Sequence, residues 1–251
     1  MESEVERPND GMTVNDIYNL YTKIQISTRL ERDEQIIDIL PSAYVVNGRI
    51  YKEEPIGAFC KTFQMEVEVV IARGDYIEGV QKSLKYAGLK IDGLILETLA
   101  TSNIILMPEE KQNGVLMLDI GGGHTDLSVY KKDKLEFYTT LPVGGDHITN
   151  DISLTFDIST DEAEKLKRQY NLALVSMITN NHEIKLTSKS SSSSTNDIVK
   201  CSEIVQVIEA RVKEIFQIIR RMLQEKGMTT AISTVVLTGQ GISNIVGAEE
   251  L

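Results

Sequence analysis

The segment from Leu118 to Asp126, which reads Leu-Asp-Ile-Gly-Gly-Gly-His-Thr-Asp, constrains the fold more than any other part of this 251-residue chain. Its apolar residues predict a strand that carries Asp119 to its end, and the three glycines allow the backbone to turn tightly there. Consecutive amides in such a turn form a concave donor site for phosphate oxygens, and a neighbouring carboxylate can hold a hydrated Mg2+. The alternative is a glycine-rich hairpin that ends in a solvated aspartate. The motif alone does not decide between the two.

The elements predicted after this motif follow one order, which makes it more specific. They are two strands over 125–130 and 135–143, a double glycine at 144–145, helices over 147–156 and 161–170, a hairpin over 184–200, a long amphipathic helix from Ser202 to Gly227, and a strand over 233–237 before Gly239. Ser159 and Glu162 predict a capping box for the second helix. The hairpin tip, Lys189 followed by five serines, is of low complexity and is expected to be mobile.

The first part of the chain predicts a smaller mixed α/β unit over residues 12–91. Its predicted elements are helices over 15–25 and 75–87 and strands over 36–46, 66–72 and 89–96. Asn47-Gly48 predicts a hairpin turn, and Gly88 is expected to end the second helix. The first ten residues are polar, and we expect them to be frayed.

The charge of the chain narrows the classes of partner. Its 37 Asp and Glu against 26 Lys and Arg give a formal net charge of −11. Duplex binding requires clustered positive charge, so no nucleic acid partner is expected, and an anionic membrane surface is an equally poor match for the chain itself. Cys60 and Cys201 are expected to be free thiols in a reducing cytoplasm. The acidic start does not predict a secretion signal.

Signatures of other enzyme classes do not occur in the sequence. It contains neither a Walker-type nor a dinucleotide-binding glycine motif, and no nucleophile elbow. The three histidines are scattered, without helical spacing or nearby cysteines, so a zinc site is not expected.

These features resemble the actin-like ATPase superfamily and, within it, the FtsA family of bacterial cell-division proteins. The segments that carry the resemblance are LPSAYVVNG, LDIGGGHTDLSVY, LPVGGDHITNDIS, DEAEKLKRQY, IEARVKEIF and VVLTGQG. They occur in order from about residue 12 to the end. The resemblance implies an α/β fold of the actin-like, ribonuclease H-like type, incomplete, with a small inserted α/β subdomain at the N-terminal end.

The resemblance also implies a division into domains. These are a family-specific interaction subdomain (1C-like) over 12–91, a strand–helix segment over 92–113 that returns to the first lobe, and a second lobe over 114–251. That lobe would comprise subdomain 2A, at 114–158 and 229–251, and subdomain 2B, at 159–228. Nothing before Thr28 resembles the first phosphate loop of the superfamily, and no membrane-targeting helix follows the last glycines. We therefore expect a fragment or truncated relative that binds ATP weakly or not at all by itself.

The resemblance implies a site for ATP and Mg2+. Its residues would be the second phosphate loop with Asp119, Gly121, Gly122, Gly123, His124 and Thr125, the glycines Gly144 and Gly145, the pair Glu164 and Lys167 beside adenine and ribose, and an adenosine loop of Gly239, Gln240 and Gly241. Asp119 would hold Mg2+, and Glu97 would orient the attacking water. The simpler alternatives are that Glu97 caps a helix, and that Glu164 and Lys167 form an ordinary exposed pair. Gln240 stands where a glycine is usual.

The function implied by the resemblance is an ATP-binding scaffold, at most a weak ATPase. Such a protein would polymerise through residues 12–91, tether the tubulin-like protein FtsZ to the cytoplasmic membrane face at mid-cell, and contact other divisome proteins. Two alternatives use the same fold: a small-metabolite kinase or polyphosphate hydrolase, and a pilus-assembly or plasmid-segregation relative.

Overall fold

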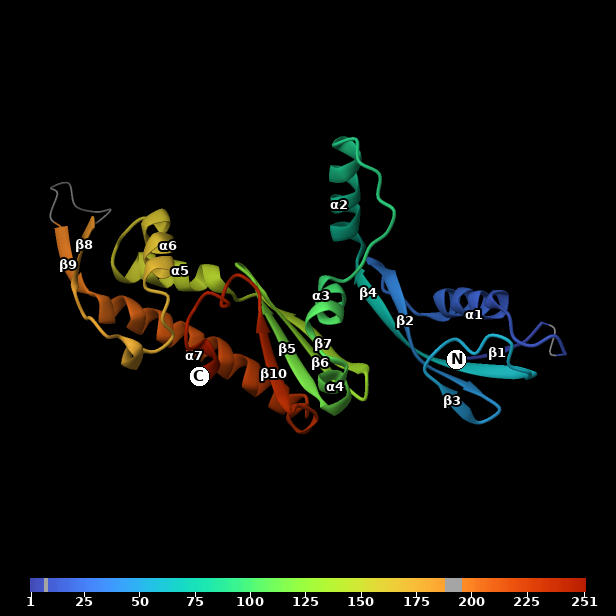
Figure 1. Ribbon diagram of the computed structural model, residues 1–251. Helices are drawn as coiled ribbons and strands as arrows, with labels where there is room; N and C mark the ends of the chain where they lie inside the picture. The colour runs from blue at the N-terminus through green and yellow to red at the C-terminus, as the bar shows by residue number, and fades with distance from the viewer. Residues whose placement is uncertain (7–8, 188–195) are drawn as a thin grey trace. The chain divides into compact units, whose positions relative to one another are not determined.

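Contacts divide the chain into two compact units, Met1–Asn103 and Ile104–Leu251, each with its own hydrophobic core. This computed structural model (Figure 1) describes residues 1–6, 9–187 and 196–251. The serine-rich tip predicted at 189–194 therefore lies outside the described residues.

The first unit contains an antiparallel sheet with the strand order β1-β4-β2-β3. Its elements are β1 (Glu2–Glu4), α1 (Val14–Ser27), β2 (Glu34–Val46), β3 (Arg49–Tyr51), β4 (Thr62–Arg73), α2 (Gly74–Tyr86) and the beginning of α3 (Glu97–Ile105). The apolar face of α1 packs on the sheet through Ile17, Leu20 and Ile24, which are buried with Tyr44, Phe63 and Met65. The predicted helices and the strands at 36–46 and 66–72 are confirmed.

A capping box fixes the start of α1. Asp16 is buried, and its carboxylate accepts hydrogen bonds from the backbone amides of Glu6 and Thr13, both at 2.8 Å. The amide of Asp16 donates in turn to the hydroxyl of Thr13 at 3.3 Å. These bonds satisfy donors that a helix N-terminus otherwise leaves without partners.

Two predictions for the first unit are wrong. The N-terminal residues are not frayed throughout, because Glu2–Glu4 pair with β4 and Ser3 is buried. A short edge strand of this kind is stabilised by backbone bonds, which a polar sequence does not reveal. Residues 89–96 form no strand, and they pair with none of the strands within the described residues. Apolar side chains alone do not make a strand where no sheet edge accepts its backbone.

The second unit contains a sheet with the strand order β10-β5-β6-β7. Strands β5 (Val115–Ile120), β6 (Thr125–Lys131) and β7 (Lys134–Leu141) form an antiparallel meander, and β10 (Thr234–Thr238) runs parallel to β5. The helices are α4 (Pro108–Asn113), α5 (Gly145–Thr155), α6 (Thr160–Gln169) and α7 (Cys201–Glu225), and β8 (Glu183–Thr187) pairs with β9 (Asn196–Lys200). Short 3-10 helices span Val175–Met177, Thr229–Ala231 and Ala248–Glu250. The elements predicted for this half are confirmed, with small shifts at their ends.

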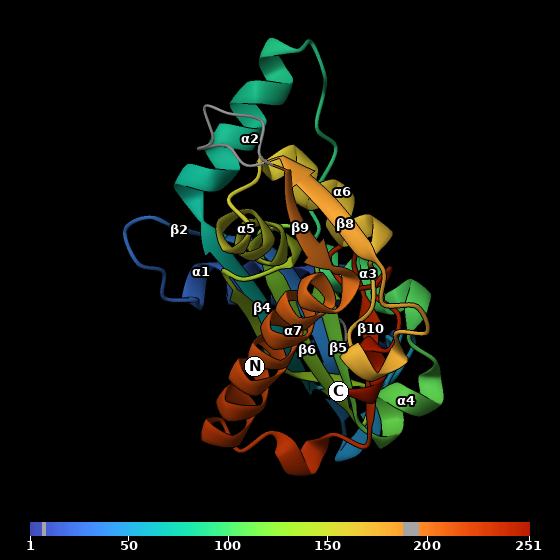
Figure 2. The same cartoon turned by 90° about the vertical axis from the view of Figure 1, so that its left-hand side faces the viewer.

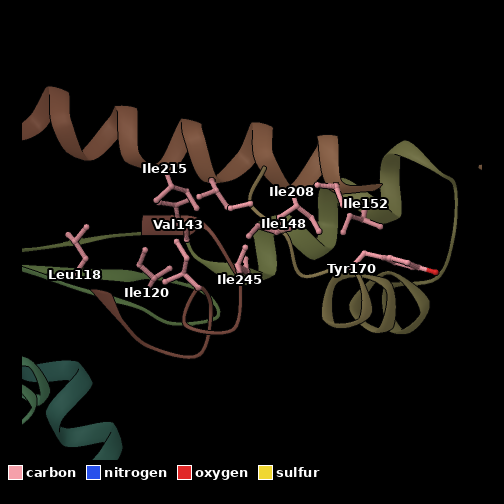
Figure 3. Packing of buried hydrophobic residues seen from close by; sticks show 14 of the residues in the cluster. Leu118, Ile120, Val143, Ile148, Ile152, Tyr170, Ile208, Ile215 and Ile245 are labelled. Carbon is pink, nitrogen blue, oxygen red and sulfur yellow. The ribbon is translucent and has the colours of Figure 1, made fainter. Parts of the chain in front are cut away.

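Helix α7 runs along one face of this sheet, and α5 packs against α7 (Figures 1 and 2). Figure 3 shows Ile208 and Ile215 of α7 packed with Ile148 of α5 and with Leu118 and Ile120 of β5. Each of these side chains is at most 2% exposed. A fully buried aliphatic side chain contributes about 1.5–3 kcal/mol, so this layer fixes the ends of β5 and α5 relative to each other.

A smaller cluster lies on the other face of the sheet, where Val115, Met117 and Tyr130 pack with Leu106.

Of the capping box predicted for α6, one hydrogen bond is present: the amide of Glu162 donates to the Ser159 hydroxyl at 3.1 Å. Among the described residues, no helix combines the length and the apolar character needed to span a bilayer.

Candidate functional site

Three glycine loops of the second unit meet beyond the end of β5. The Gly145 amide donates to the Gly121 carbonyl at 2.9 Å, and the Asp146 amide donates to the Gly122 carbonyl at 2.8 Å. From the third loop, the Gly241 amide donates to the Ile120 carbonyl at 2.7 Å. The start of α5 and the end of β10 therefore hold the 121–123 bend from two sides.

The glycines are required because these backbones approach closely. A Cβ on Gly144 would lie 2.5 Å from the carbonyl oxygens of both Gly121 and Gly122, and a Cβ on Gly241 would overlap the Gly121 oxygen. The reason for glycine at these positions is therefore close contact with the protein's own backbone.

The bend itself presents amides to solvent. Its first amide, that of Gly121, donates to the His124 carbonyl at 2.9 Å. Gly122, Gly123 and His124 are exposed, and within the described residues their amides donate no backbone hydrogen bond. The bend is thus neither packed among side chains nor fully paired, as a concave anion-binding turn requires.

Two carboxylates lie side by side at the base of the bend, because Asp119 of β5 is the register partner of Asp126 of β6. Asp126 is 8% exposed, and its Oδ1 accepts hydrogen bonds from the hydroxyls of Tyr138, at 3.1 Å, and Thr140. Its Oδ2 lies 3.8 Å from His124 Nε2. Although Asp126 is the last residue of the glycine motif, no role in the site was predicted for it.

These carboxylates fit the oxygen ligands that Mg2+ takes. No group of three His, Cys, Asp or Glu that could hold a metal occurs in the described part of the chain. Mg2+ does not require one, because it is usually held by one or two carboxylates together with phosphate oxygens and water.

A pocket of about 460 Å³ opens beside the three loops. Its lining residues are Gly122, Gly145, Asp146, Glu164, Lys167, Arg168, Asn171, Gln240, Gly241, Asn244 and Ile245. The pocket therefore brings together predicted residues from each glycine loop and from α6. Gln240 is exposed on its wall.

Glu164 and Lys167 are not an ordinary exposed pair. Lys167 Nζ lies 2.6 Å from Glu164 Oε2, and the Lys167 side chain is only 12% exposed. Burial raises the pKa of the Glu164 carboxyl, but hydrogen bonds from Lys167, Thr149 and Arg168 outweigh it and lower that pKa to about 2. Glu164 thus stays ionised at the edge of the pocket.

The remaining predicted residues lie outside the pocket lining. Asp119 lies near the end of β5, and the others are Gly121, Gly123, His124, Gly144 and Gly239 of the surrounding loops. One prediction needs correction, because Thr125 was expected to belong to the phosphate loop of the site. Its hydroxyl is buried and donates to the Val143 carbonyl at 2.6 Å, so it holds two loops together instead.

Glu97 belongs to the other unit of the chain. It is the exposed first residue of α3, in the first unit. Its role in orienting water stays a prediction.

Several residues that line the pocket were not predicted from the sequence. Asp146 directly follows the double glycine at the start of α5, which is a signal that could have identified it. Asn171 and Asn244 offered none, because they meet only in the fold, where Asn171 Nδ2 donates to the Asn244 carbonyl at 2.6 Å. Arg168, which follows Lys167 on α6, also lines the pocket and was not predicted.

Sequence comparison identifies the family. Residues 116–251 match the model of the family described as "Cell division protein FtsA". The curated relatives include cell division protein FtsA of Pseudomonas aeruginosa, 30% identical over 87% of this chain and 52% of the relative, and that of Bacillus subtilis, 28% identical over 94% and 53%. FtsA of Escherichia coli is 26% identical over 95% of this chain and 58% of the relative. The chain thus spans about half the length of these relatives.

Solved structures show the same fold. MreB5 of Spiroplasma citri bound to ADP matches with a TM-score of 0.60 and 19% identity, over 71% of this chain and 57% of that one. A PilM–PilN type IV pilus biogenesis complex matches with a TM-score of 0.61 and 20% identity, over 100% and 60%. The chain has an actin-like ATPase fold and belongs to the FtsA family of cell division proteins.

Proposed function

We propose that this chain forms the nucleotide-binding lobe of an actin-like cell-division scaffold, and that its pocket takes ATP with Mg2+. The observation that carries the proposal is that the glycine bend with exposed amides and the Glu164–Lys167 pair meet at one cavity, while two adjacent carboxylates lie at the base of the same bend. Its fold neighbour MreB5 is described as bound to ADP and to AMPPNP, which supports a nucleotide as the ligand.

In this proposal each group has a separate task. The amides of Gly122, Gly123 and His124 donate to phosphate oxygens, as consecutive amides in other anion-binding turns do. Asp119, with Asp126 beside it, holds the hydrated Mg2+ that neutralises phosphate charge. Glu164 and Lys167 contact the nucleoside end, with Gln240 on the facing wall.

The wider role follows from family membership. We propose that the protein polymerises through residues 12–91 and tethers an FtsZ-type partner to the cytoplasmic membrane face at mid-cell, together with other divisome proteins. Slow hydrolysis, with Glu97 orienting water, would change the balance between two conformations of the scaffold.

Substitution of Asp119 tests the nucleotide site. Asp119→Ala should abolish the Mg2+-dependent part of ATP binding, because it removes the carboxylate at the base of the bend. The measurement is titration calorimetry with ATP, with and without Mg2+. Asp161→Ala is the matched control, since Asp161 is an exposed carboxylate on α6 that belongs to neither the pocket lining nor the glycine motif. Unchanged Mg2+ dependence in Asp119→Ala would return Asp119 to a structural role.

Co-sedimentation tests the scaffold role. Nucleotide-dependent pelleting with FtsZ polymers or lipid vesicles is expected. Rapid phosphoryl transfer to a small acceptor, without pelleting, would favour the kinase alternative instead.

A further inference from the structure

Thr149 lies behind the pocket wall and takes no part in the function proposed above. It stands on α5, one helical turn after Gly145, and is 4% exposed. Its hydroxyl accepts a hydrogen bond from Lys167 Nζ at 2.8 Å and donates one to Glu164 Oε2 at 2.5 Å. One buried hydroxyl of α5 therefore contacts both members of the ion pair on α6.

The two carboxylate oxygens of Glu164 differ in the number of hydrogen bonds that they accept. Oε2 receives Lys167 Nζ at 2.6 Å as well as the Thr149 hydroxyl, which fills its capacity of about two hydrogen bonds. Oε1 receives Nε of Arg168 at 2.8 Å, and the Arg168 side chain is 79% exposed. Because exposed ion pairs contribute little to stability, Arg168 can move aside. Oε1 is thus the oxygen that can accept a bond from a ligand.

The same network continues toward the glycine bend. Lys167 Nζ also donates to the Gly145 carbonyl at 3.2 Å, and the Gly145 amide donates to the Gly121 carbonyl at 2.9 Å. A continuous series of hydrogen bonds therefore joins α6 to the bend through the first turn of α5. Thr149 is the side chain of α5 that fixes the α6 end of this series.

We propose that Thr149 is a positioning residue, which orients Glu164 so that Oε1 accepts a hydrogen bond from a ribose hydroxyl of the bound nucleotide. This inference rests on the proposed function, because it assumes a nucleotide in the pocket. It predicts that loss of the Thr149 hydroxyl weakens recognition of the ribose without removing any group that touches the ligand.

The test compares Thr149→Val, which keeps the shape of the side chain and removes the hydroxyl, with Thr149→Ser, which keeps the hydroxyl. The first readout is the pKa of the Glu164 carboxyl, followed by NMR in the ligand-free protein. It lies at about 2 in the unchanged protein and should rise by about one unit in Thr149→Val, because the ionised form loses a donor. Thr149→Ser should retain the low value.

The second readout is affinity for Mg2+-ADP and for Mg2+-2′,3′-dideoxy-ADP, from NMR titration up to millimolar concentration. Thr149→Val should lose about tenfold in ADP affinity and lose the preference for ADP over the dideoxy analogue, whereas Thr149→Ser should keep both. Thr155→Val, an exposed position at the end of the same helix, should leave both readouts unchanged.

The outcomes separate this inference from the proposed function. If the unchanged protein shows no saturable shift with Mg2+-ADP up to millimolar concentration, at which even weak binding is visible, the proposed function fails. If it binds ADP and Thr149→Val leaves either the Glu164 pKa or the ribose preference unaltered, the positioning role is overturned. Should Thr149→Val fail to fold, Thr149→Ala is measured by the same two readouts.

Discussion

Glycines occupy two different kinds of position in the two units. In the first unit, Gly48 and Gly88 have φ of +75° and +74°, and a Cβ on either would have no neighbour within 4 Å. They reverse the chain in open space. In the second unit, Gly144 and Gly241 are buried, and a side chain on either would strike the 121–123 bend. Packed glycines also occur away from the pocket, as Gly11 against Gly57 and Gly114 against Ala231 show, so close packing indicates a site only where several such glycines meet.

The largest effect is expected for Gly144→Ala. Its Cβ would lie 2.5 Å from the carbonyl oxygens of Gly121 and Gly122, so the bend or the start of α5 must shift. We expect the free energy of unfolding of the second unit to fall by about 3 kcal/mol, measured by urea denaturation. A loss below about 0.5 kcal/mol would show that the three loops are not tightly packed, and the comparison between the two units would fail.

An intermediate effect is expected from pH at the pocket. Because the folded-state pKa of Glu164 is about 2, below the unfolded value of about 4.3, its stabilisation is fully present above pH 4.3 and is lost as pH falls toward 2. With allowance for the partial exposure of Glu164, we expect its ionised carboxylate to contribute about 1–2 kcal/mol to the free energy of unfolding. Glu164→Gln should remove this part of the acid dependence in denaturation curves followed through the second unit.

The first unit supplies the comparison for this experiment. Burial raises the pKa of Asp16, but the hydrogen bonds from Glu6 and Thr13 outweigh it, so this pKa is lowered too. Asp16→Asn should therefore flatten the acid dependence of the first unit alone. If Glu164→Gln changed the acid dependence of the first unit's stability as much as that of the second, the dependence could not be assigned to Glu164.

The smallest effect is expected for Gly79→Ala. Gly79 is an exposed residue within α2, and a Cβ there would have no neighbour within 4 Å. Alanine should stabilise the first unit by about 0.5–1 kcal/mol, because glycine is unfavourable in a helix interior. Thermal denaturation measures this change. A clear destabilisation by Gly79→Ala would show that Gly79 is in close contact with its surroundings, as Gly144 and Gly241 are.

Local patterns predicted the fold of the second unit well. The continuous apolar run of β5 and the three glycines after it are signals confined to one segment, and the period of α7 from Ile204 to Leu223 is unambiguous. Residues 89–96 were mispredicted because pairing depends on a sheet edge that the segment does not meet within the described residues.

The site was predicted only in part, for the same reason. Glu164, Lys167 and Gln240 came from the resemblance, and they line the pocket. Thr149 and the contact between Asn171 and Asn244 were not predictable, because their partners are distant in sequence. Thr125 was misjudged because its hydroxyl donates to Val143, a carbonyl that the motif does not contain.

The most direct test follows the backbone amides of the glycine bend by NMR while Mg2+-ADP is added. If the bend binds phosphate, the resonances of Gly122 and Gly123 shift saturably and Gly48, in its open turn, does not change. Addition of nucleotide to millimolar concentration that leaves Gly122 and Gly123 unmoved would contradict the account.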